Sequence, residues 1–181
     1  APAPPPLVGS VQTGSLRSID DVAFPLQAPD GRTTLLLVWA TYTPDSVAML
    51  PELAEVERRR PDSIRSAAAA IQGRSEIVEW LARGEEPTPF PIVADEGSDR
   101  NDLVDWAEDR PTLWILASDG RVLGRLEGRQ DANAILAEVD RLDAARADET
   151  EATSTGGPGP LGGCVIERRD GAVPEDLRRR T

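Results

Sequence analysis

Thr33-Thr34-Leu35-Leu36-Leu37-Val38-Trp39-Ala40-Thr41-Tyr42-Thr43-Pro44-Asp45-Ser46 passes from strand-like to helix-like character within a few residues. Its first half, Thr33–Trp39, is a continuous apolar run rich in β-favouring residues, which predicts a strand buried on both faces. In the second half, Thr43 suits a helix N-cap, Pro44 the first helical position and Asp45 the first turn. The sequence therefore predicts a buried strand that leads through a short turn into a helix.

The helix that begins at Pro44 has a distinct apolar face and a distinct end. Three arginines, Arg58–Arg60, suit its C-terminus, because cations are favoured at the negative end of the helix dipole. Pro51 lies inside the helix and predicts a kink. The apolar face repeats at helical spacing and consists of Met49, Leu50, Leu53 and Val56.

Further strand and helix patterns follow along the chain. Ile64–Ile71 fits either a strand or a helix, since its alanines favour a helix. The other expected elements are a strand at Val22–Leu26, a turn at Pro29–Arg32, a helix from Ser75 as N-cap to Arg83, a strand at Phe90–Asp95, a helix at Asn101–Glu108, a strand at Arg110–Leu116, a hairpin turn at Ser118–Arg121, a strand at Val122–Glu127 and a helix at Ala132–Ala147.

Two motifs resemble the thioredoxin superfamily, in its TlpA/ResA-type branch of membrane-tethered thiol-disulfide reductases. They are Trp39-Ala40-Thr41 with Pro44, and Pro111-Thr112 before the turn at Ser118–Arg121. The resemblance covers about residues 19–147. It implies an α/β fold with a central mixed β-sheet flanked by helices, and it favours a strand at Ile64–Ile71. It also implies a cis peptide bond at Pro111, facing the Thr43–Ser46 turn across a substrate groove.

The chain departs from that family at the positions that carry its chemistry. The family has Trp-Ala-Thr-x-Cys-Pro-x-Cys, and here Thr43 and Ser46 stand in place of the two cysteines. Thiol-disulfide exchange needs a thiolate that attacks sulfur, which a hydroxyl cannot supply. We therefore expect no catalytic residue in this turn. Capping of the helix is the favoured role for the two hydroxyls, and anion binding at the helix start is the alternative.

The composition excludes several classes of function. With 32 acidic and 20 basic residues, the chain of 181 residues has a formal net charge of −12, which disfavours binding to nucleic acid and to anionic membrane surfaces. It contains no histidine and no lysine, so it lacks imidazole metal ligands and the usual nucleophile–histidine pairs. We expect no metal, no cofactor and, because the longest apolar run is far shorter than ~20 residues, no transmembrane segment.

The chain divides into a Pro-rich N-terminal arm at 1–18, a thioredoxin-like domain at 19–147 and a Gly/Pro-rich, charged C-terminal tail at 148–181. Arms of such composition can become ordered on a partner and cover a large surface. We expect the arm and the tail to contact protein partners. Cys164, the only cysteine, lies in the tail and could form an intermolecular disulfide.

The first residues, Ala1–Pro6, resemble a mature end left after removal of a signal or anchor segment. We therefore expect an extracytoplasmic location in a bacterium, periplasmic or membrane-associated, with any peripheral membrane association made through a partner or a removed anchor. The carboxylates of Asp95–Asp102 do not have the spacing of a calcium-binding loop.

Three functions fit this sequence. The leading prediction is a redox-inactive thioredoxin-like protein that serves as an accessory subunit of a larger assembly. An enzyme with chemistry other than that of a Cys-x-x-Cys pair, or with a thiol function of Cys164, is the second. A chaperone-like module that binds extended peptides is the third. The predicted partner or peptide groove consists of Trp39, Tyr42, Thr43, Pro44, Arg110 and Pro111.

Overall fold

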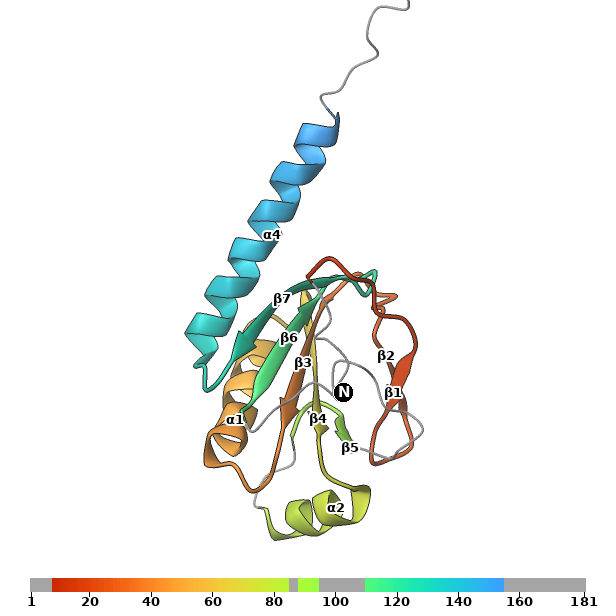
Figure 1. The fold of residues 1–181 in the computed structure, drawn as a ribbon, viewed down its shortest axis with the longest axis vertical. Coiled ribbons are helices and arrows are strands. Elements are labelled where there is room, and N and C mark those ends of the chain that lie inside the picture. Colours follow the sequence, from red (N-terminus) through yellow and green to blue (C-terminus); the bar gives the residue numbers. More distant parts are fainter. Residues whose placement is uncertain (1–7, 85–87, 95–109, 155–181) are drawn as a thin grey trace, which may run out of the picture. The chain divides into compact units, whose positions relative to one another are not determined.

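A computed structural model describes residues 8–84, 88–94 and 110–154 of the chain. Within these residues, a five-stranded mixed β-sheet has the strand order β5-β4-β3-β6-β7 (Figure 1). Its central strand β3 pairs in parallel with β4 on one side and antiparallel with β6 on the other. The strands are β3 (Thr33–Trp39), β4 (Ile64–Ala70), β5 (Ile92–Ala94), β6 (Thr112–Leu116) and β7 (Val122–Glu127). This is the predicted α/β fold class with a central mixed sheet.

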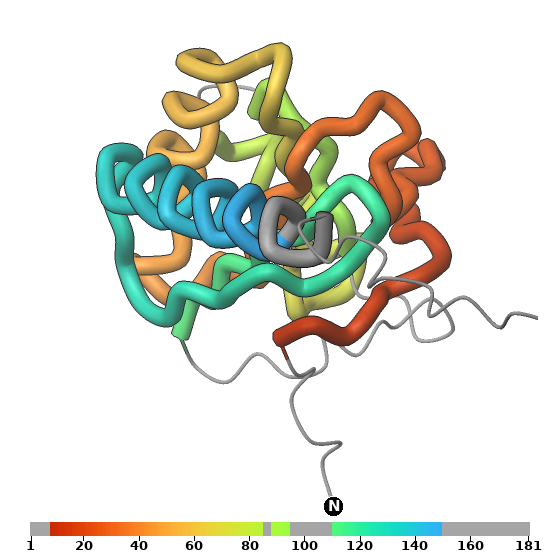
Figure 2. The backbone as a smooth tube through the Cα atoms, turned by 90° about the horizontal axis from the view of Figure 1, so that it is seen from above, coloured from red at the N-terminus to blue at the C-terminus, as the bar shows by residue number. Residues whose placement is uncertain are grey.

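The two faces of the sheet are covered differently. The helices α1 (Pro44–Arg59), α2 (Arg74–Arg83) and the first part of α4 (Ala132–Ser154) pack on one face. An antiparallel hairpin of β1 (Ser15–Arg17) and β2 (Ala23–Pro25) packs on the other. Figure 2 shows α1 and the first part of α4 on one side and the hairpin on the opposite side. All residues of β3, β4 and β6 are buried, as expected for strands covered on both faces.

Successive residues of β3 belong to different halves of the core. Leu35, Leu37 and Trp39 pack with the helices, whereas Leu36 and Val38 pack with the hairpin. This follows from the period of two along a strand, which sends neighbouring side chains to opposite faces of the sheet. The apolar run of β3 thus supplies both layers of the core.

The strand–turn–helix prediction for the first part of the domain is confirmed. β3 spans Thr33–Trp39, and α1 begins with Pro44 at its first position and ends beside Arg60. Pro51 lies inside α1, which continues as one helix across it. The ambiguous segment is strand β4, because its alanines are small enough to pack on both faces of a sheet whose neighbours are β3 and β5.

Two boundaries differ from the predictions. The N-cap of α2 is Gly73 rather than Ser75, and the carbonyl oxygen of Gly73 accepts hydrogen bonds from the amides of Glu76 and Ile77 at 3.1 and 3.3 Å. The last helix extends past Ala147 to Ser154, since no glycine or proline interrupts the chain before Gly156. The predicted helix at Asn101–Glu108, the loop at Asp95–Asp102 and Cys164 lie outside the described residues.

Part of the predicted N-terminal arm belongs to the folded domain. The amide of Gly9 donates to the carbonyl of Val122 at 2.7 Å, and the amide of Gln12 donates to that of Gly120 at 2.8 Å. The amide of Val122 in turn donates to the carbonyl of Ser10 at 2.8 Å. These bonds, together with strand β1, fix residues 9–17 against the β6–β7 hairpin and β2, so this segment contributes to the core through Leu16.

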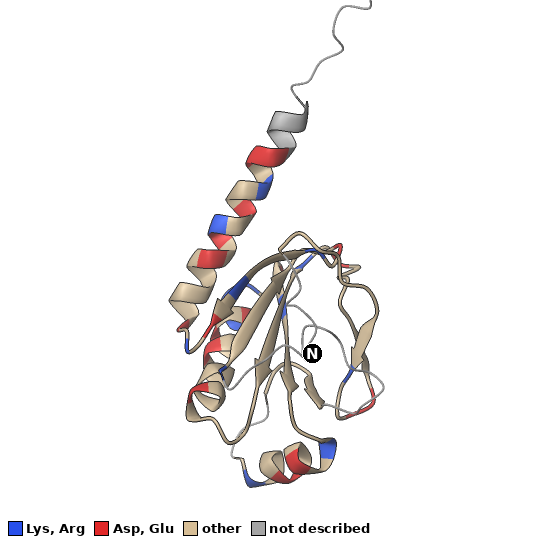
Figure 3. Cartoon of the chain, viewed as in Figure 1, with Lys and Arg blue, Asp and Glu red and all other residues tan. Residues whose placement is uncertain are grey.

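Charged side chains lie mostly on the helices and loops, and the strands are mostly uncharged (Figure 3). Arg65 of β4 is the buried exception among the described residues. Its guanidinium donates to Oγ1 of Thr34 at 2.8 Å and to the carbonyl of Pro25, and it lies 4.5 Å from the ring centroid of Phe24. Burial lowers the pKa of Arg65. In the described part of the chain, no helix has the length and apolar character needed to span a membrane.

Candidate functional site

The turn between β3 and α1 is formed by backbone hydrogen bonds. Thr43 has an extended conformation, with φ −106° and ψ 109°, and its carbonyl accepts bonds from the amides of Ser46 and Val47 at 3.0 and 3.1 Å. Thr43 is the N-cap residue, as predicted, but its hydroxyl makes no capping hydrogen bond. Ser46 is 2% exposed, so its hydroxyl lies beneath the surface of the turn. Hydroxyl capping of this helix, favoured by the sequence, is thus not observed at Thr43.

A glutamine that the sequence analysis did not identify holds this turn. Oε1 of Gln72 accepts a hydrogen bond of 2.8 Å from the amide of Thr41, and its Nε2 donates to Oε2 of Glu76 at 3.1 Å. Gln72 follows β4, whose parallel pairing with β3 brings the ends of both strands to the same edge of the sheet. No local pattern distinguishes this residue, because its role depends on that pairing.

Trp39 supports the turn from inside the core. It is 1% exposed, and its ring packs edge-on against Trp80 of α2 with the centroids 5.2 Å apart. Its Nε1 has no hydrogen-bond partner among the described residues. Trp39 therefore fixes the end of β3 rather than offering a surface to a partner.

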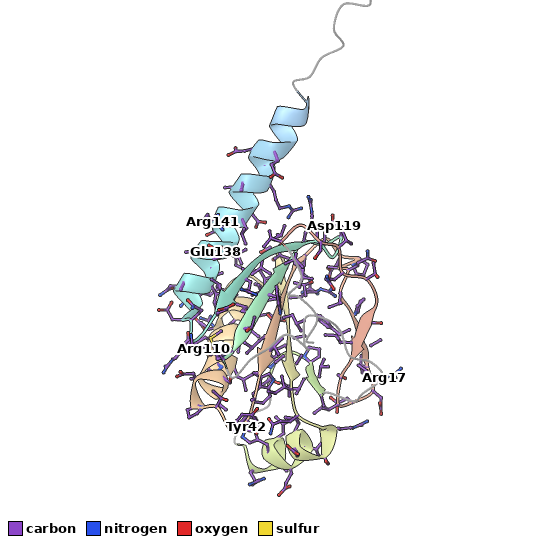
Figure 4. The ribbon with its side chains drawn as sticks, viewed as in Figure 1. Arg17, Tyr42, Arg110, Asp119, Glu138 and Arg141 are labelled. Carbon is purple, nitrogen blue, oxygen red and sulfur yellow. The ribbon has the colours of Figure 1, made fainter. Side chains whose placement is uncertain are left out.

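Tyr42, by contrast, lies at the surface with 61% of its area exposed. Thr112, the first residue of β6, pairs with Val38 near the end of β3, so the Arg110–Pro111 segment lies at the end of the sheet where α1 begins. Arg110 is exposed and Pro111 is buried. Figure 4 shows Tyr42 and Arg110 toward this end. The structure thus brings the predicted groove residues to one end of the sheet, with Tyr42, Pro44 and Arg110 as its exposed members.

Pro111 is anchored by its backbone. The amide of Gly128 donates to the carbonyl of Pro111 at 2.8 Å, next to the start of β6. No peptide bond between described residues is cis, so the Arg110–Pro111 bond is trans. This differs from the cis bond that the resemblance to the TlpA/ResA-type family implies.

The chemistry available at this turn is that of hydrogen bonding. The hydroxyls of Thr43 and Ser46, the phenol of Tyr42 and the guanidinium of Arg110 can donate or accept hydrogen bonds. None of the described segments 8–84, 88–94 and 110–154 contains a cysteine or a histidine, and none contributes to a group of acidic, histidine or cysteine side chains that could hold a metal ion. A hydroxyl cannot form the mixed disulfide that thiol exchange requires.

A cavity of about 850 Å³ lies between α1 and α2. Glu57 is one of its lining residues, but Oε2 of its carboxylate is buried rather than exposed to the cavity. Burial raises the pKa of Glu57, and hydrogen bonding from Ser66 together with the positive charge of Arg32 opposes this shift. No sequence pattern predicts this cavity, because it forms only when the two helices pack. Its lining residues are Val47, Leu50, Pro51, Ala54, Glu55, Glu57, Arg58, Pro61, Trp80, Leu81, Gly84, Thr88 and Pro89.

Solved structures of thioredoxin-like proteins have the same fold as this chain. The exposed lipoprotein thioredoxin Etrx1 of Streptococcus pneumoniae aligns with a TM-score of 0.62 at 17% identity, over 72% of this chain and 99% of that protein. A putative thiol:disulfide interchange protein DsbE of Chlorobium tepidum aligns with a TM-score of 0.61 at 18% identity, over 75% and 96%. StoA of Bacillus subtilis gives 0.56 at 18% identity, over 70% and 96%.

No protein-family model matches the sequence, and no curated protein matches it. At 17–18% identity, the structural similarity establishes the thioredoxin-like fold. The activity of the chain has to be argued from its own residues.

Proposed function

We propose that this protein is a redox-inactive thioredoxin-like subunit that acts by binding a protein partner. The observation that carries the proposal is the start of α1, where Thr43 is the N-cap and Ser46 is buried in the first turn. A helix N-terminus is where a thioredoxin-fold enzyme needs a thiolate of lowered pKa. The turn keeps the backbone geometry of a helix start while two hydroxyls occupy positions where exchange would need sulfur.

The proposed contact surface is the exposed part of the same turn. Tyr42 and Arg110 are residue types enriched at protein interfaces, because each combines a large contact area with hydrogen-bonding groups. The net charge of −12 favours a basic protein partner over nucleic acid. The arm at 1–18 and the tail at 148–181 would extend this contact, with residues 9–17 already fixed on the domain.

We place the protein outside the cytoplasm, in the periplasm or at the membrane through a partner. One similar structure is itself described as an exposed lipoprotein thioredoxin. Fractionation of the native cell tests the location directly.

The redox part of the proposal is tested by reduction of insulin disulfides with dithiothreitol. The protein and its Cys164→Ser variant should both give the uncatalysed rate. A catalysed rate that disappears in Cys164→Ser would favour the second candidate, a thiol function of the tail. A catalysed rate in both proteins would show non-thiol chemistry in the domain, and either result overturns the redox-inactive assignment.

The binding part is tested by purification of the native complex. One defined partner should co-purify in fixed stoichiometry and dissociate more readily from the Tyr42→Ala protein. Val78→Ala is the matched control, since Val78 is an exposed apolar residue on α2, 47% exposed. If the Tyr42→Ala and Val78→Ala complexes were equally stable, the turn would not belong to the interface. A native protein that elutes as a free monomer would contradict the subunit role.

The exposure of Tyr42 also favours a second candidate, a chaperone-like module for extended peptides. Such a module would bind many unrelated unfolded chains through their backbone. A subunit would bind one folded partner. A peptide array therefore separates the two, because broad binding that is lost in Tyr42→Ala indicates the chaperone-like function.

A further inference from the structure

The cavity between α1 and α2 has the size and the apolar character of a small-molecule site. Its volume of about 850 Å³ lies within the range of roughly 300–1,000 Å³ that is usual for such sites. The cavity follows one stripe of α1 through Val47 and Pro51, and Trp80 and Leu81 of α2 also line it. The ring of Trp80 packs edge-on against Trp39, so this part of the wall is held in place by the core.

The charged side chains of the wall are already engaged or buried. Arg58 and Arg59 donate to the carboxylate of Glu55 at 2.7 Å, so the acid and Arg58 both serve an ion pair within α1. Oε2 of Glu57 is buried rather than exposed to the cavity. A charged ligand would lose its water here without meeting an opposite charge, which is costly. The wall therefore favours an uncharged ligand.

Pro51 provides the wall with one neutral acceptor. It lies inside α1, and a proline has no amide hydrogen to donate to the carbonyl four residues earlier, which is that of Val47. In an α-helix that carbonyl points toward the residue four positions later, on the same face of the helix. Because Val47 and Pro51 both line the cavity, the carbonyl oxygen of Val47 lies in its wall and receives no bond from position 51.

We propose that this cavity binds an uncharged aromatic compound with one hydrogen-bond donor, which bonds to the carbonyl oxygen of Val47. The indole of Trp80 and the rings of Pro51, Pro61 and Pro89 give the wall rigid, flat surfaces. Such surfaces suit a planar ring, since aromatic contacts are favourable and proline loses no rotamer freedom on contact. The single acceptor orients the ring, as a few polar groups do in mostly apolar sites.

The test compares three probes that share one ring system: indole, N-methylindole and tryptamine. Indole has one N–H donor, N-methylindole has none, and tryptamine adds a positive charge. Binding to the full chain at physiological ionic strength, which screens surface charges, is followed by NMR shifts of the methyl groups of Leu50 and Leu81 and of the carbonyl carbon of Val47. Indole should bind roughly two- to tenfold more tightly than N-methylindole, the range of a neutral hydrogen bond. Tryptamine should bind no more tightly than indole.

Two proline variants connect the preference to the acceptor. In Pro51→Ala, the new amide hydrogen donates to the carbonyl of Val47 through the ordinary helical bond, so the preference for indole over N-methylindole should fall to about one. Pro61→Ala is the matched control, because it removes a proline ring from the same wall but lies beyond the end of α1 and restores no helical bond. Its preference should persist. Ala54→Trp should fill the cavity and weaken all three probes, and thermal unfolding verifies that each variant is folded.

Four outcomes would overturn the proposal. Equal affinities of the unmodified protein for indole and N-methylindole would show that no acceptor selects the ligand. A preference that persists in Pro51→Ala, or that disappears equally in Pro61→Ala, would exclude the carbonyl of Val47 as the selecting group. Tighter binding of tryptamine would show an available negative charge. Shifts unchanged by Ala54→Trp would locate the binding elsewhere, and if that variant fails to fold, the two proline variants decide alone. None of these measurements involves Tyr42, so the result is independent of the proposed partner surface.

Discussion

Replacing Gly120 with alanine should release the N-terminal segment from the domain. Gly120 lies in the turn between β6 and β7 with a φ of +84°, and a Cβ built on it would lie 2.2 Å from the carbonyl oxygen of Gln12. That oxygen is backbone, so the clash cannot be relieved by a side-chain rotation. The segment at 9–12 would have to move away from the hairpin, and the bond from the amide of Gln12 to Gly120 would break.

The size of the effect follows from two contributions. A left-handed conformation costs a residue with a Cβ roughly 1–2 kcal/mol. Moving the segment breaks the backbone hydrogen bonds that join Gly9, Ser10 and Gln12 to the hairpin, each worth about 1 kcal/mol. With three such bonds, Gly120→Ala should lower the free energy of unfolding by about 4–5 kcal/mol.

Gly31→Ala is the matched control. Gly31 has a similar φ of +80°, but no atom lies within 4 Å of its Cβ position, so it should show only the conformational cost of roughly 1–2 kcal/mol. Urea unfolding measures both variants, and amide hydrogen exchange at Gln12 and Val122 reports the segment itself. Equal destabilisation of the two variants, or unchanged exchange protection in Gly120→Ala, would show that residues 9–12 do not belong to the cooperative domain.

The other predictions concern the starts of α1 and α4 and the ion pairs of Glu55 with Arg58 and Arg59. The double variant Thr43→Cys, Ser46→Cys should catalyse the reduction of insulin disulfides that the unmodified turn does not, because a thiol at a helix N-terminus has a lowered pKa. Glu52→Ala should lower the free energy of unfolding by about 1 kcal/mol, the usual value of a helix cap, since Oε2 of Glu52 accepts a 2.9 Å bond from the first turn of α4. Glu55→Gln should make stability less sensitive to acid, because two arginines lower the pKa of Glu55 from 4.5 to about 2. Its contribution is complete above pH 4.5 and is lost as the pH falls toward 2.

Each of these predictions has a result that contradicts it. A folded double-cysteine variant that forms its disulfide but leaves insulin reduction uncatalysed would show that the turn lacks more than its thiols. Glu79→Ala, an exposed control on α2, should leave the free energy of unfolding unchanged. If the free energies of unfolding of Glu52→Ala and Glu79→Ala were equal, Glu52 would not act as a cap of α4. For Glu55, urea midpoints between pH 4.5 and 2 that shift equally in both proteins would refute the assigned pKa.

The local part of the site could be predicted because its signals lie close together in sequence. Thr43, Pro44 and Asp45 are consecutive, and each favours a helix start through its own backbone chemistry. The strand Thr33–Trp39 is recognised from its continuous run of β-favouring residues. All seven of these residues are buried in the structure. The capping groups were not predicted correctly, since Gly73 rather than Ser75 is the N-cap of α2 and the hydroxyl of Thr43 makes no capping bond.

The supporting contacts of the site could not be predicted in the same way. Gln72 reaches Thr41 across 31 positions of sequence, and Trp80 reaches Trp39 from a different helix. None of these residues differs, in its own neighbourhood of sequence, from an ordinary polar or aromatic residue on a helix or loop.

The sequence by itself determined the order of strands and helices, the two hydroxyls at the start of α1 and the acidic charge of the chain. These properties depend on residue types within a few positions of one another. Only the tertiary structure decided that the alanines of β4 form a strand, that residues 9–17 belong to the domain and that a cavity forms between α1 and α2. Those outcomes depend on pairing and packing between distant segments, where the energy of burying each side chain is set by its neighbours in space.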